Sequence, residues 1–225
     1  MNILAFDTSY EVMHVTLGQN DTVLDSRMVG NTEQGYNSAY LISTIADVMQ
    51  KNNLKMQDVG ALGVNIGPGS FTGLRACVTV GRVLAQQLEI PVVGIPSFQI
   101  YSMLNSKKEK TFCIMDARRG KAYAGIYNKN SDPVMNPCAM EYEESFDIAK
   151  SEEFFIISDS RMVKKLEENN LTGVNFQETG VDYGFFLLKQ TLKHLKNQPK
   201  EDFNWRNLKP LYIQPPPITI SKKQT

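Results

Sequence analysis

The residues best suited to chemistry lie in one glycine-rich stretch, residues 67–75. A predicted strand enters this stretch and a predicted helix leaves it, so the first N–H groups of the helix and its dipole favour an anion there. The alternative is a tight, capped turn that binds nothing. The candidate residues for an anion or nucleotide are Gly67, Gly69, Ser70, Thr72, Gly73 and Arg75.

The known phosphate motifs do not fit this stretch. A Walker loop needs a lysine before its Ser or Thr, and residues 67–75 contain none. The dinucleotide fingerprint needs a third glycine where Thr72 stands, and Gly73 comes one residue late. Ser70 or Thr72 can cap the following helix.

Two further polar groups come directly after predicted strands. Asp7, Thr8 and Ser9 end the first strand, where a carboxylate can orient a hydrated divalent cation and hydroxyls can hold phosphate oxygens. Asp116, Arg118 and Arg119 form a predicted hairpin turn whose arginines suit a carboxylate or phosphate. The competing interpretations are an Asx turn for the first group and a solvated turn for the second.

Other reactive residues are sparse. The two histidines, His14 and His194, and the three cysteines show neither zinc-ligand spacing nor a disulfide framework. No nucleophile-elbow motif is present.

With 24 basic and 24 acidic residues the chain has no net charge, which disfavours a protein that binds nucleic acid by itself. The N-terminal residues do not resemble a signal peptide and no stretch suits a membrane span, so we expect a soluble, cytoplasmic protein.

The predicted elements form two α/β lobes with mixed sheets flanked by helices. Both lobes start with an apolar strand that ends in Asp and is followed by a hairpin return, which indicates a duplicated fold. We expect an N-terminal lobe at 1–104, a C-terminal lobe at 105–214 and a flexible tail at 215–225. The predicted strands are 3–6, 12–17, 23–29, 61–66, 91–95, 111–115, 121–127 and 154–157, and the predicted helices are 33–51, 73–89, 161–169 and 181–196.

Two helices, 33–51 and 73–89, carry apolar residues at helical spacing. Core packing explains such a stripe, and a partner-binding face explains it as well, because aromatic residues and Met are enriched at interfaces. The candidate contact residues are Tyr36, Tyr40, Ile45, Met49, Leu74 and Val78.

Taken together, these motifs resemble the TsaB family, also called YeaZ. The resemblance rests on residues 3–9, 67–75, 81–94 and 116–120 with Tyr123, which occur in family order within residues 1–127, and on Pro210-Leu211-Tyr212 near the end. One departure lies at 34–38, where the family often has a His before Ser or Thr and this chain has Gln34-Gly35-Tyr36-Asn37-Ser38.

The resemblance implies two ribonuclease-H-like lobes of the actin/sugar-kinase/Hsp70 (ASKHA) superfamily. It implies a non-catalytic scaffold or activator subunit, without its own metal or cofactor, for N6-threonylcarbamoyladenosine formation at position 37 of tRNAs reading ANN codons. The implied partners are a catalytic TsaD-type paralogue, a TsaE-type ATPase and a second copy of the chain through the N-terminal helices. ATP or ADP, and tRNA, would be contacted only within that complex.

Two alternatives stay open. Asp7 and the 67–72 loop are compatible with an ATP-dependent small-molecule kinase of the same fold, although the second lobe lacks the glycine and hydroxyl residues that wrap phosphate. A glycoprotease-like peptidase is the weaker alternative, because no nucleophile–base pair is readable.

Overall fold

Two five-stranded mixed sheets of the same topology form the frame of the molecule. The structure is a computed structural model and describes residues 1–31, 36–107 and 109–214. In each sheet three antiparallel strands are followed by two parallel ones. The first sheet has the order β3-β2-β1-β4-β5 and consists of β1 (Asn2–Asp7), β2 (Val12–Gln19), β3 (Thr22–Gly30), β4 (Val59–Gly67) and β5 (Val92–Pro96). The second has the order β10-β9-β6-β7-β8 and consists of β6 (Lys110–Arg118), β7 (Lys121–Asn128), β8 (Pro133–Glu141), β9 (Phe155–Ser158) and β10 (Val174–Asn175). The predicted fold class is confirmed.

The apolar run at the N-terminus forms a central strand because both of its faces are covered. Ile3 and Ala5 point into one hydrophobic cluster, Leu4 and Phe6 point into another, and all four are 0% exposed. A strand buried on both faces has no room for an alternating polar pattern. The same argument holds for β4 as far as Val64.

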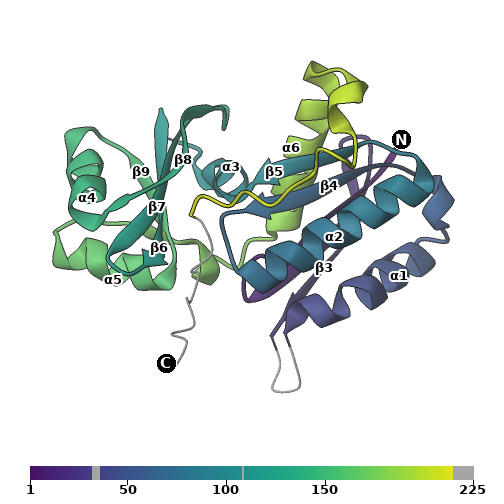
Figure 1. The fold of residues 1–225 in the computed structure, drawn as a ribbon, viewed down its shortest axis with the longest axis horizontal. Coiled ribbons are helices and arrows are strands. Elements are labelled where there is room, and N and C mark those ends of the chain that lie inside the picture. The colour runs from purple at the N-terminus through teal and green to yellow at the C-terminus, as the bar shows by residue number, and fades with distance from the viewer. Residues whose placement is uncertain (32–35, 108, 215–225) are drawn as a thin grey trace, which may run out of the picture.

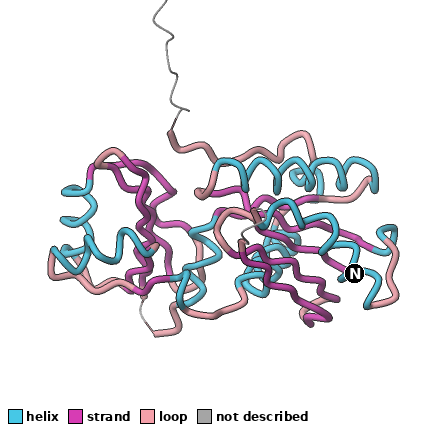
Figure 2. The backbone as a smooth tube through the Cα atoms, turned by 90° about the horizontal axis from the view of Figure 1, so that it is seen from below, coloured by secondary structure: helices cyan, strands magenta, loops and turns pink. Residues whose placement is uncertain are grey.

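Helices cover both faces of the sheets (Figures 1 and 2). The α-helices are α1 (Leu41–Lys51), α2 (Phe71–Leu88), α3 (Ser97–Tyr101), α4 (Tyr142–Ser151), α5 (Ser160–Glu168) and α6 (Tyr183–Asn197), and the 3-10 turns are η1 (Asn37–Tyr40), η2 (Met56–Asp58), η3 (Ser102–Leu104), η4 (Phe176–Glu178) and η5 (Lys200–Phe203). The helix predicted at 33–51 begins later in the structure, at Leu41, after the 3-10 turn η1. Residues 32–35 lie outside the described residues. In the described part of the chain no helix is both long and apolar enough to cross a membrane.

The predicted lobe boundaries assign helix α6 to the C-terminal lobe, residues 105–214, but its packing partner is the first sheet. The helix packs on β1, β2, β4 and β5 of the first sheet. Small residues admit it: a Cβ at Gly63 would lie 2.0 Å from the Thr191 hydroxyl and a Cβ at Gly18 would lie 2.4 Å from Leu188. The chain beyond α6 also stays on the first lobe, where the Leu211 N–H donates to the Ile66 carbonyl over 2.7 Å. The predicted tail, 215–225, lies outside the described residues.

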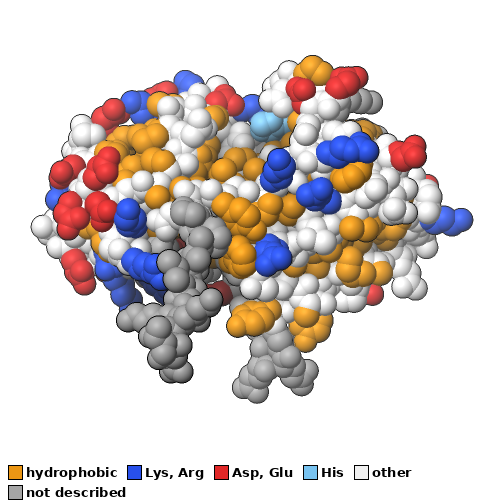
Figure 3. Space-filling view, in the orientation of Figure 1, with side chains coloured by type: hydrophobic (Ala, Val, Ile, Leu, Met, Phe, Trp, Pro, Cys, Tyr) orange, Lys and Arg blue, Asp and Glu red, His pale blue; other side chains and the backbone are white. Residues whose placement is uncertain are grey.

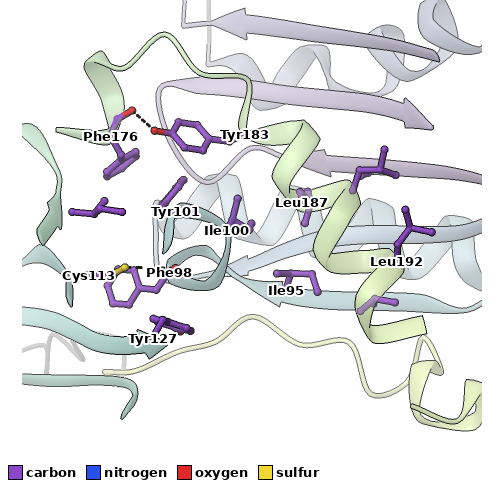
Figure 4. Close-up of a cluster of buried hydrophobic side chains, with 14 of the residues drawn as sticks. Ile95, Phe98, Ile100, Tyr101, Cys113, Tyr127, Phe176, Tyr183, Leu187 and Leu192 are labelled. Carbon is purple, nitrogen blue, oxygen red and sulfur yellow. Dashed lines mark hydrogen bonds between the residues drawn. The ribbon is translucent and has the colours of Figure 1, made fainter. Parts of the chain in front are cut away.

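One hydrophobic cluster joins the two lobes (Figure 4). Phe98 and Tyr101 of α3 contribute to it together with Cys113 of the second sheet, and the rings of Tyr101 and Phe176 stack at 4.2 Å. The hydroxyl of Tyr183 donates to the Phe176 carbonyl over 2.8 Å. The lobes therefore share a packed core instead of meeting at an open hinge.

Candidate functional site

A cleft of about 620 Å³ opens between the lobes. The first lobe lines it with the turn after β1, the residues around η1 and the loop before α2, and the second lobe lines it with the β6–β7 hairpin and the start of α5. The structure thus brings most of the predicted site residues together. The lining contains Thr8, Ser9, Tyr36, Gly69, Ser70, Thr72, Gly73, Asp116 and Arg118 from the sequence analysis.

Of the residues predicted for an anion or for the second-lobe hairpin, four are not in the lining: Asp7, Gly67, Arg75 and Arg119. Asp7 is only 3% exposed, and each of its carboxylate oxygens accepts a hydrogen bond of 2.7 Å, one from the Ser9 N–H and one from the Asn65 side-chain amide. Its carboxylate fixes the turn after β1 and does not face the cleft.

Sequence reasoning missed Asn65 and Ser97, which are both 0% exposed. The Asn65 amide also donates to the Ser9 hydroxyl over 3.1 Å, and its carbonyl oxygen accepts from the Gly67 N–H over 2.8 Å. The Ser97 hydroxyl lies 2.9 Å from that same oxygen and 2.7 Å from the Pro68 carbonyl. These two side chains connect β1, the glycine-rich loop and α3. A lone Asn in an otherwise apolar strand was the signal.

The loop before α2 is glycine-rich because it packs against the backbone of the turn that follows β1, at Thr8 and Ser9. The Ser70 N–H donates to the Ser9 carbonyl and the Thr8 hydroxyl donates to the Gly73 carbonyl, both over 2.7 Å. A Cβ at Gly73 would lie 1.9 Å from the Thr8 carbonyl oxygen, so only glycine fits. The Ser70 hydroxyl accepts from the Gly73 N–H over 3.4 Å, which confirms Ser70 as the helix cap.

Arg75 is not among the residues that line the cleft, although it contacts Phe71, which is. Its guanidinium lies 5.2 Å from the centre of the Phe71 ring, and that ring lies 5.7 Å from the Tyr212 ring. A cation over an aromatic face is a favourable contact by itself. Arg75 is the fifth residue of α2, beyond its first turn, and its contact with Phe71 accounts for its position without an anion.

The second lobe uses its carboxylates in a similar way. One oxygen of Asp116 accepts from the Arg118 N–H and the Tyr142 hydroxyl, both over 2.8 Å. Asp159 accepts from the Asp116 N–H over 3.0 Å and from the N–H groups of Arg161 and Met162 at the start of α5. Burial raises the pKa of Asp159, and these N–H donors partly offset the rise. Burial and the hydrogen bond to Asp116 raise the pKa of Tyr142 to about 12.

Four of the six predicted contact residues lie in the core, which corrects that prediction. Ile45, Met49, Leu74 and Val78 are 2–3% exposed and pack beneath their helices. Tyr36 is 73% exposed and Tyr40 is half-buried. A stripe at helical spacing marks the buried face, so the outward face of these helices carries other residues.

Three exposed apolar residues form what we call the helix face: Tyr36 just before η1, Ile42 of α1 and Phe71 of α2, which are 50–73% exposed. Tyr36 and Phe71 also line the cleft, and Ile42 does not. Apolar side chains are visible over this part of the molecule in the space-filling view (Figure 3). Ile42 and Phe71 were not predicted, because each departs from the apolar stripe of its helix.

No cluster of three or more His, Cys, Asp or Glu that could hold a metal ion occurs among the residues that the structure describes. Cys77 and Cys113 are buried, which raises the pKa of both thiols well above the ordinary value. A buried thiol with a raised pKa stays protonated, so neither cysteine is a candidate for a reactive thiolate.

Three comparisons with known proteins bear on this site. A family model described as "TsaD: tRNA N6-adenosine threonylcarbamoyltransferase" matches residues 36–197. The TsaB proteins of Bacillus subtilis and Escherichia coli, both named as tRNA threonylcarbamoyladenosine biosynthesis proteins, are 30% and 26% identical over 128 and 137 residues. These matches cover 56% and 60% of this chain and 55% and 58% of the relatives, so the chain spans little more than half the length of the curated relatives it matches.

The solved structures agree on the fold. A Pseudomonas aeruginosa protein described as similar to peptidase YEAZ matches with a TM-score of 0.76 at 19% identity, over 95% of this chain and 99% of that one. A putative N-acetylmannosamine kinase from Listeria monocytogenes matches with a TM-score of 0.51 at 9% identity, over 88% and 100%. At these identities the likeness concerns the architecture alone.

Proposed function

We propose a function from one premise: the chain belongs to the family of the TsaD model and, within it, to the TsaB (YeaZ) group. It acts as a non-catalytic scaffold or activator that binds a TsaD-type catalytic paralogue during threonylcarbamoyl transfer to adenosine 37 of tRNAs reading ANN codons. The relatives' names support the pathway, and the site geometry supports the division of labour.

The observation that carries this proposal is the use of the carboxylates. A phosphotransferase of this fold would need an acid that reaches the metal of its nucleotide across the cleft. Asp7 is buried with both oxygens accepting hydrogen bonds from its own chain. Asp116 and Asp159 are engaged by backbone N–H groups and by Tyr142. These acids hold backbone in place, which supports a docking role over a kinase role.

The helix face is the surface we assign to the paralogue. Tyr36 and Phe71 expose apolar side chains where they line the cleft, Ile42 exposes one on α1, and Tyr212 extends this surface through its contact with Phe71. Exposed aromatic anchors on otherwise rigid helices are typical of binding hot spots. A TsaE-type ATPase, ATP or ADP, and tRNA would be bound only by the assembled complex.

Reconstitution tests the proposal. Threonylcarbamoyl transfer by a TsaD-type protein is measured with wild-type chain, without it, and with Ile42→Lys, whose side chain is exposed enough for the variant to fold. We expect wild type to raise the rate and Ile42→Lys to lose most of that gain, since a charge at a hot spot costs about 2 kcal/mol or more. Equal rates with and without the chain would refute the role.

Calorimetric titration of the isolated chain with Mg-ATP distinguishes the kinase alternative. We expect no tight binding. A tight, magnesium-dependent complex would favour the kinase over the scaffold.

A further inference from the structure

Two segments of the first lobe contain cations and no acid. Helix α2 carries Arg75 and Arg82. Residues 204–214 carry Arg206 and Lys209, and neither segment contains an Asp or a Glu. The chain as a whole has as many acidic as basic residues, so its zero net charge hides an uneven distribution. A local basic surface attracts a polyanion at short range whatever the net charge is.

The two segments lie side by side and run in opposite directions. Trp205 lies next to Arg82, in the second half of α2, and Tyr212 lies next to Phe71, at the start of that helix. The cations of both segments therefore share one surface. Figure 3 shows Lys and Arg side chains over this part of the front face, with Asp and Glu toward its rim.

An aromatic ring holds the guanidinium groups of this surface in place. The guanidinium groups of Arg82 and Arg206 lie 5.7 Å and 4.5 Å from the centre of the Trp205 ring. Within the part of the chain that the structure describes, no carboxylate lies within ion-pair distance of Arg82, Arg206 or Lys209. A ring contact fixes a guanidinium without neutralising its charge, so its N–H donors can still bind an anion. The planar guanidinium matches the oxygens of a phosphate.

A hollow of about 850 Å³ lies next to these cations, between the end of α2 and η5. Trp205 and Arg206 line it, and two acids, Glu89 and Glu201, line it as well. Three residues with side-chain amides complete the polar lining: Gln86, Gln87 and Asn204. Amides both donate and accept hydrogen bonds, as the edges of nucleobases do. The acids disfavour a phosphate inside the hollow, so a nucleotide there would place its base inside and its phosphate near Arg206.

We propose that this surface binds the phosphate backbone of an RNA strand. We call it the arginine surface, and it consists of Arg82, Trp205, Arg206 and Lys209. The inference rests on the proposed function, whose substrate is a tRNA, and adds the place where this chain would contact that RNA. Arginine and aromatic side chains together are typical of surfaces that bind RNA strands.

The arginine surface and the helix face can be occupied at the same time. Phe71 and Arg82 are eleven residues apart on α2, which is about 16 Å along a helix. A paralogue on the helix face therefore leaves the other end of α2 open to RNA. Three cations make too few phosphate contacts for tight binding alone, so the surface adds affinity within the assembled complex.

Titration of a fluorescently labelled tRNA transcript that reads an ANN codon tests the proposal. The full-length chain in complex with a TsaD-type protein is compared with the same complex carrying Arg206→Gln and Lys209→Gln, whose wild-type side chains are both exposed. We expect the double variant to lose about tenfold or more in tRNA affinity at about 0.1 M salt. The slope of log K against log salt concentration should fall by about 1.4–1.8, because each phosphate contact contributes about 0.7–0.9.

A second double variant, Lys189→Gln with Lys164→Gln, is the matched control. It removes the same charge from exposed positions elsewhere. Lys189 also contacts a ring, 4.4 Å from the centre of Phe185, but it lies on α6, which covers the opposite face of the first sheet from α2. We expect the control complex to bind tRNA like wild type. Unchanged affinity and slope in the Arg206→Gln, Lys209→Gln variant, or an equal loss in the control, would overturn the proposal.

Gel filtration of the same samples separates this inference from the proposed function. If the Arg206→Gln, Lys209→Gln variant no longer co-elutes with the TsaD-type protein and wild type does, the arginine surface is a protein contact and the RNA proposal is wrong. If wild type itself forms no complex, the proposed function fails. The isolated chain is then titrated with the same transcript at low salt, where wild type and the control should bind and the variant should not. No binding by wild type there would overturn the RNA proposal too.

Discussion

The two lobes share one topology and differ in the segment after their fourth strand. After β4 a glycine-rich loop leads into α2, a helix of 18 residues. After β9 the chain passes through Asp159 directly into α5, a helix of 9 residues. The first lobe therefore has a loop that needs support, whereas the second lobe has only a helix start that needs a cap.

Each lobe uses polar side chains for that local task. In the first, Asn65 and Ser97 hold the loop against the turn after β1. In the second, the Asp159 carboxylate caps α5 and holds β6. Strand-end acids, which in the sequence indicate an anion site in each lobe, therefore hold backbone in place in both lobes.

The largest expected effect comes from Gly73→Ala. The added Cβ would meet the Thr8 carbonyl oxygen at 1.9 Å, so the backbone must move, and we expect a loss of about 3 kcal/mol in unfolding free energy. Urea denaturation measures it. Gly30→Ala is the matched control, because no atom lies within 4 Å of a Cβ there. Equal stability of the two variants would show that the loop does not depend on close approach.

Asn65→Ala comes next. It leaves one oxygen of the buried Asp7 carboxylate without its amide donor, together with the Gly67 N–H. Leaving such groups unpaired costs about 2–3 kcal/mol. Ser97→Ala removes only one hydroxyl and should cost about 1 kcal/mol. If Asn65→Ala were as stable as wild type, the proposed support of the loop would be wrong.

Gly120→Ala probes the second lobe's own glycine, which is required for a different reason. Gly120 has φ of +81° and a Cβ there would find only the Glu141 carboxylate, at 4.0 Å. We expect a loss of about 1 kcal/mol from the left-handed backbone alone. Gly120→Asn should recover most of it, since Asn tolerates this region, whereas Gly73→Asn should not be tolerated. Thermal melts of the four variants make the comparison, and a Gly120→Asn no better than Gly120→Ala would contradict it.

Asp159→Asn gives a pH-dependent effect. The asparagine oxygen can still cap α5, but its amide nitrogen cannot accept from the Asp116 N–H as the second carboxylate oxygen does, so we expect a loss of about 1 kcal/mol near neutral pH. Because burial raises the pKa of Asp159, the folded chain holds this proton more tightly than the unfolded chain. Its stabilising contribution is full below the ordinary pKa and is lost as the pH rises through the folded-state pKa. Wild type should therefore lose stability relative to the variant across that acid window in urea titrations, and a gain would contradict the shift.

The sequence predicted the fold and part of the site. The apolar run ending in Asp7 and the cap at Ser70 are readable from local pattern, and the structure confirms both. The support by Asn65 could not be predicted, because its partners lie up to 58 residues away in the chain. The packing of α6 on the first sheet could not be predicted for a similar reason. The sequence of an amphipathic helix shows which of its faces is apolar, but it does not show which sheet that face covers.

The contact face shows another limit. Ile45 and Met49 have the spacing of a helical stripe, and this spacing is the same whether a sheet or another protein covers the stripe. Only their burial, at 3% exposure each, assigns them to the core. Ile42 became a candidate when the structure showed which side of α1 is free.

The most direct test is the rate of tRNA threonylcarbamoylation by a TsaD-type protein with three forms of this chain. Ile42→Lys alters the helix face, and Arg118→Ala removes a guanidinium from the cleft. If the chain works by docking, Arg118→Ala supports the reaction like wild type and Ile42→Lys does not. Loss of activity in Arg118→Ala, with full activity in Ile42→Lys, would show that the cleft and not the helix face does the work.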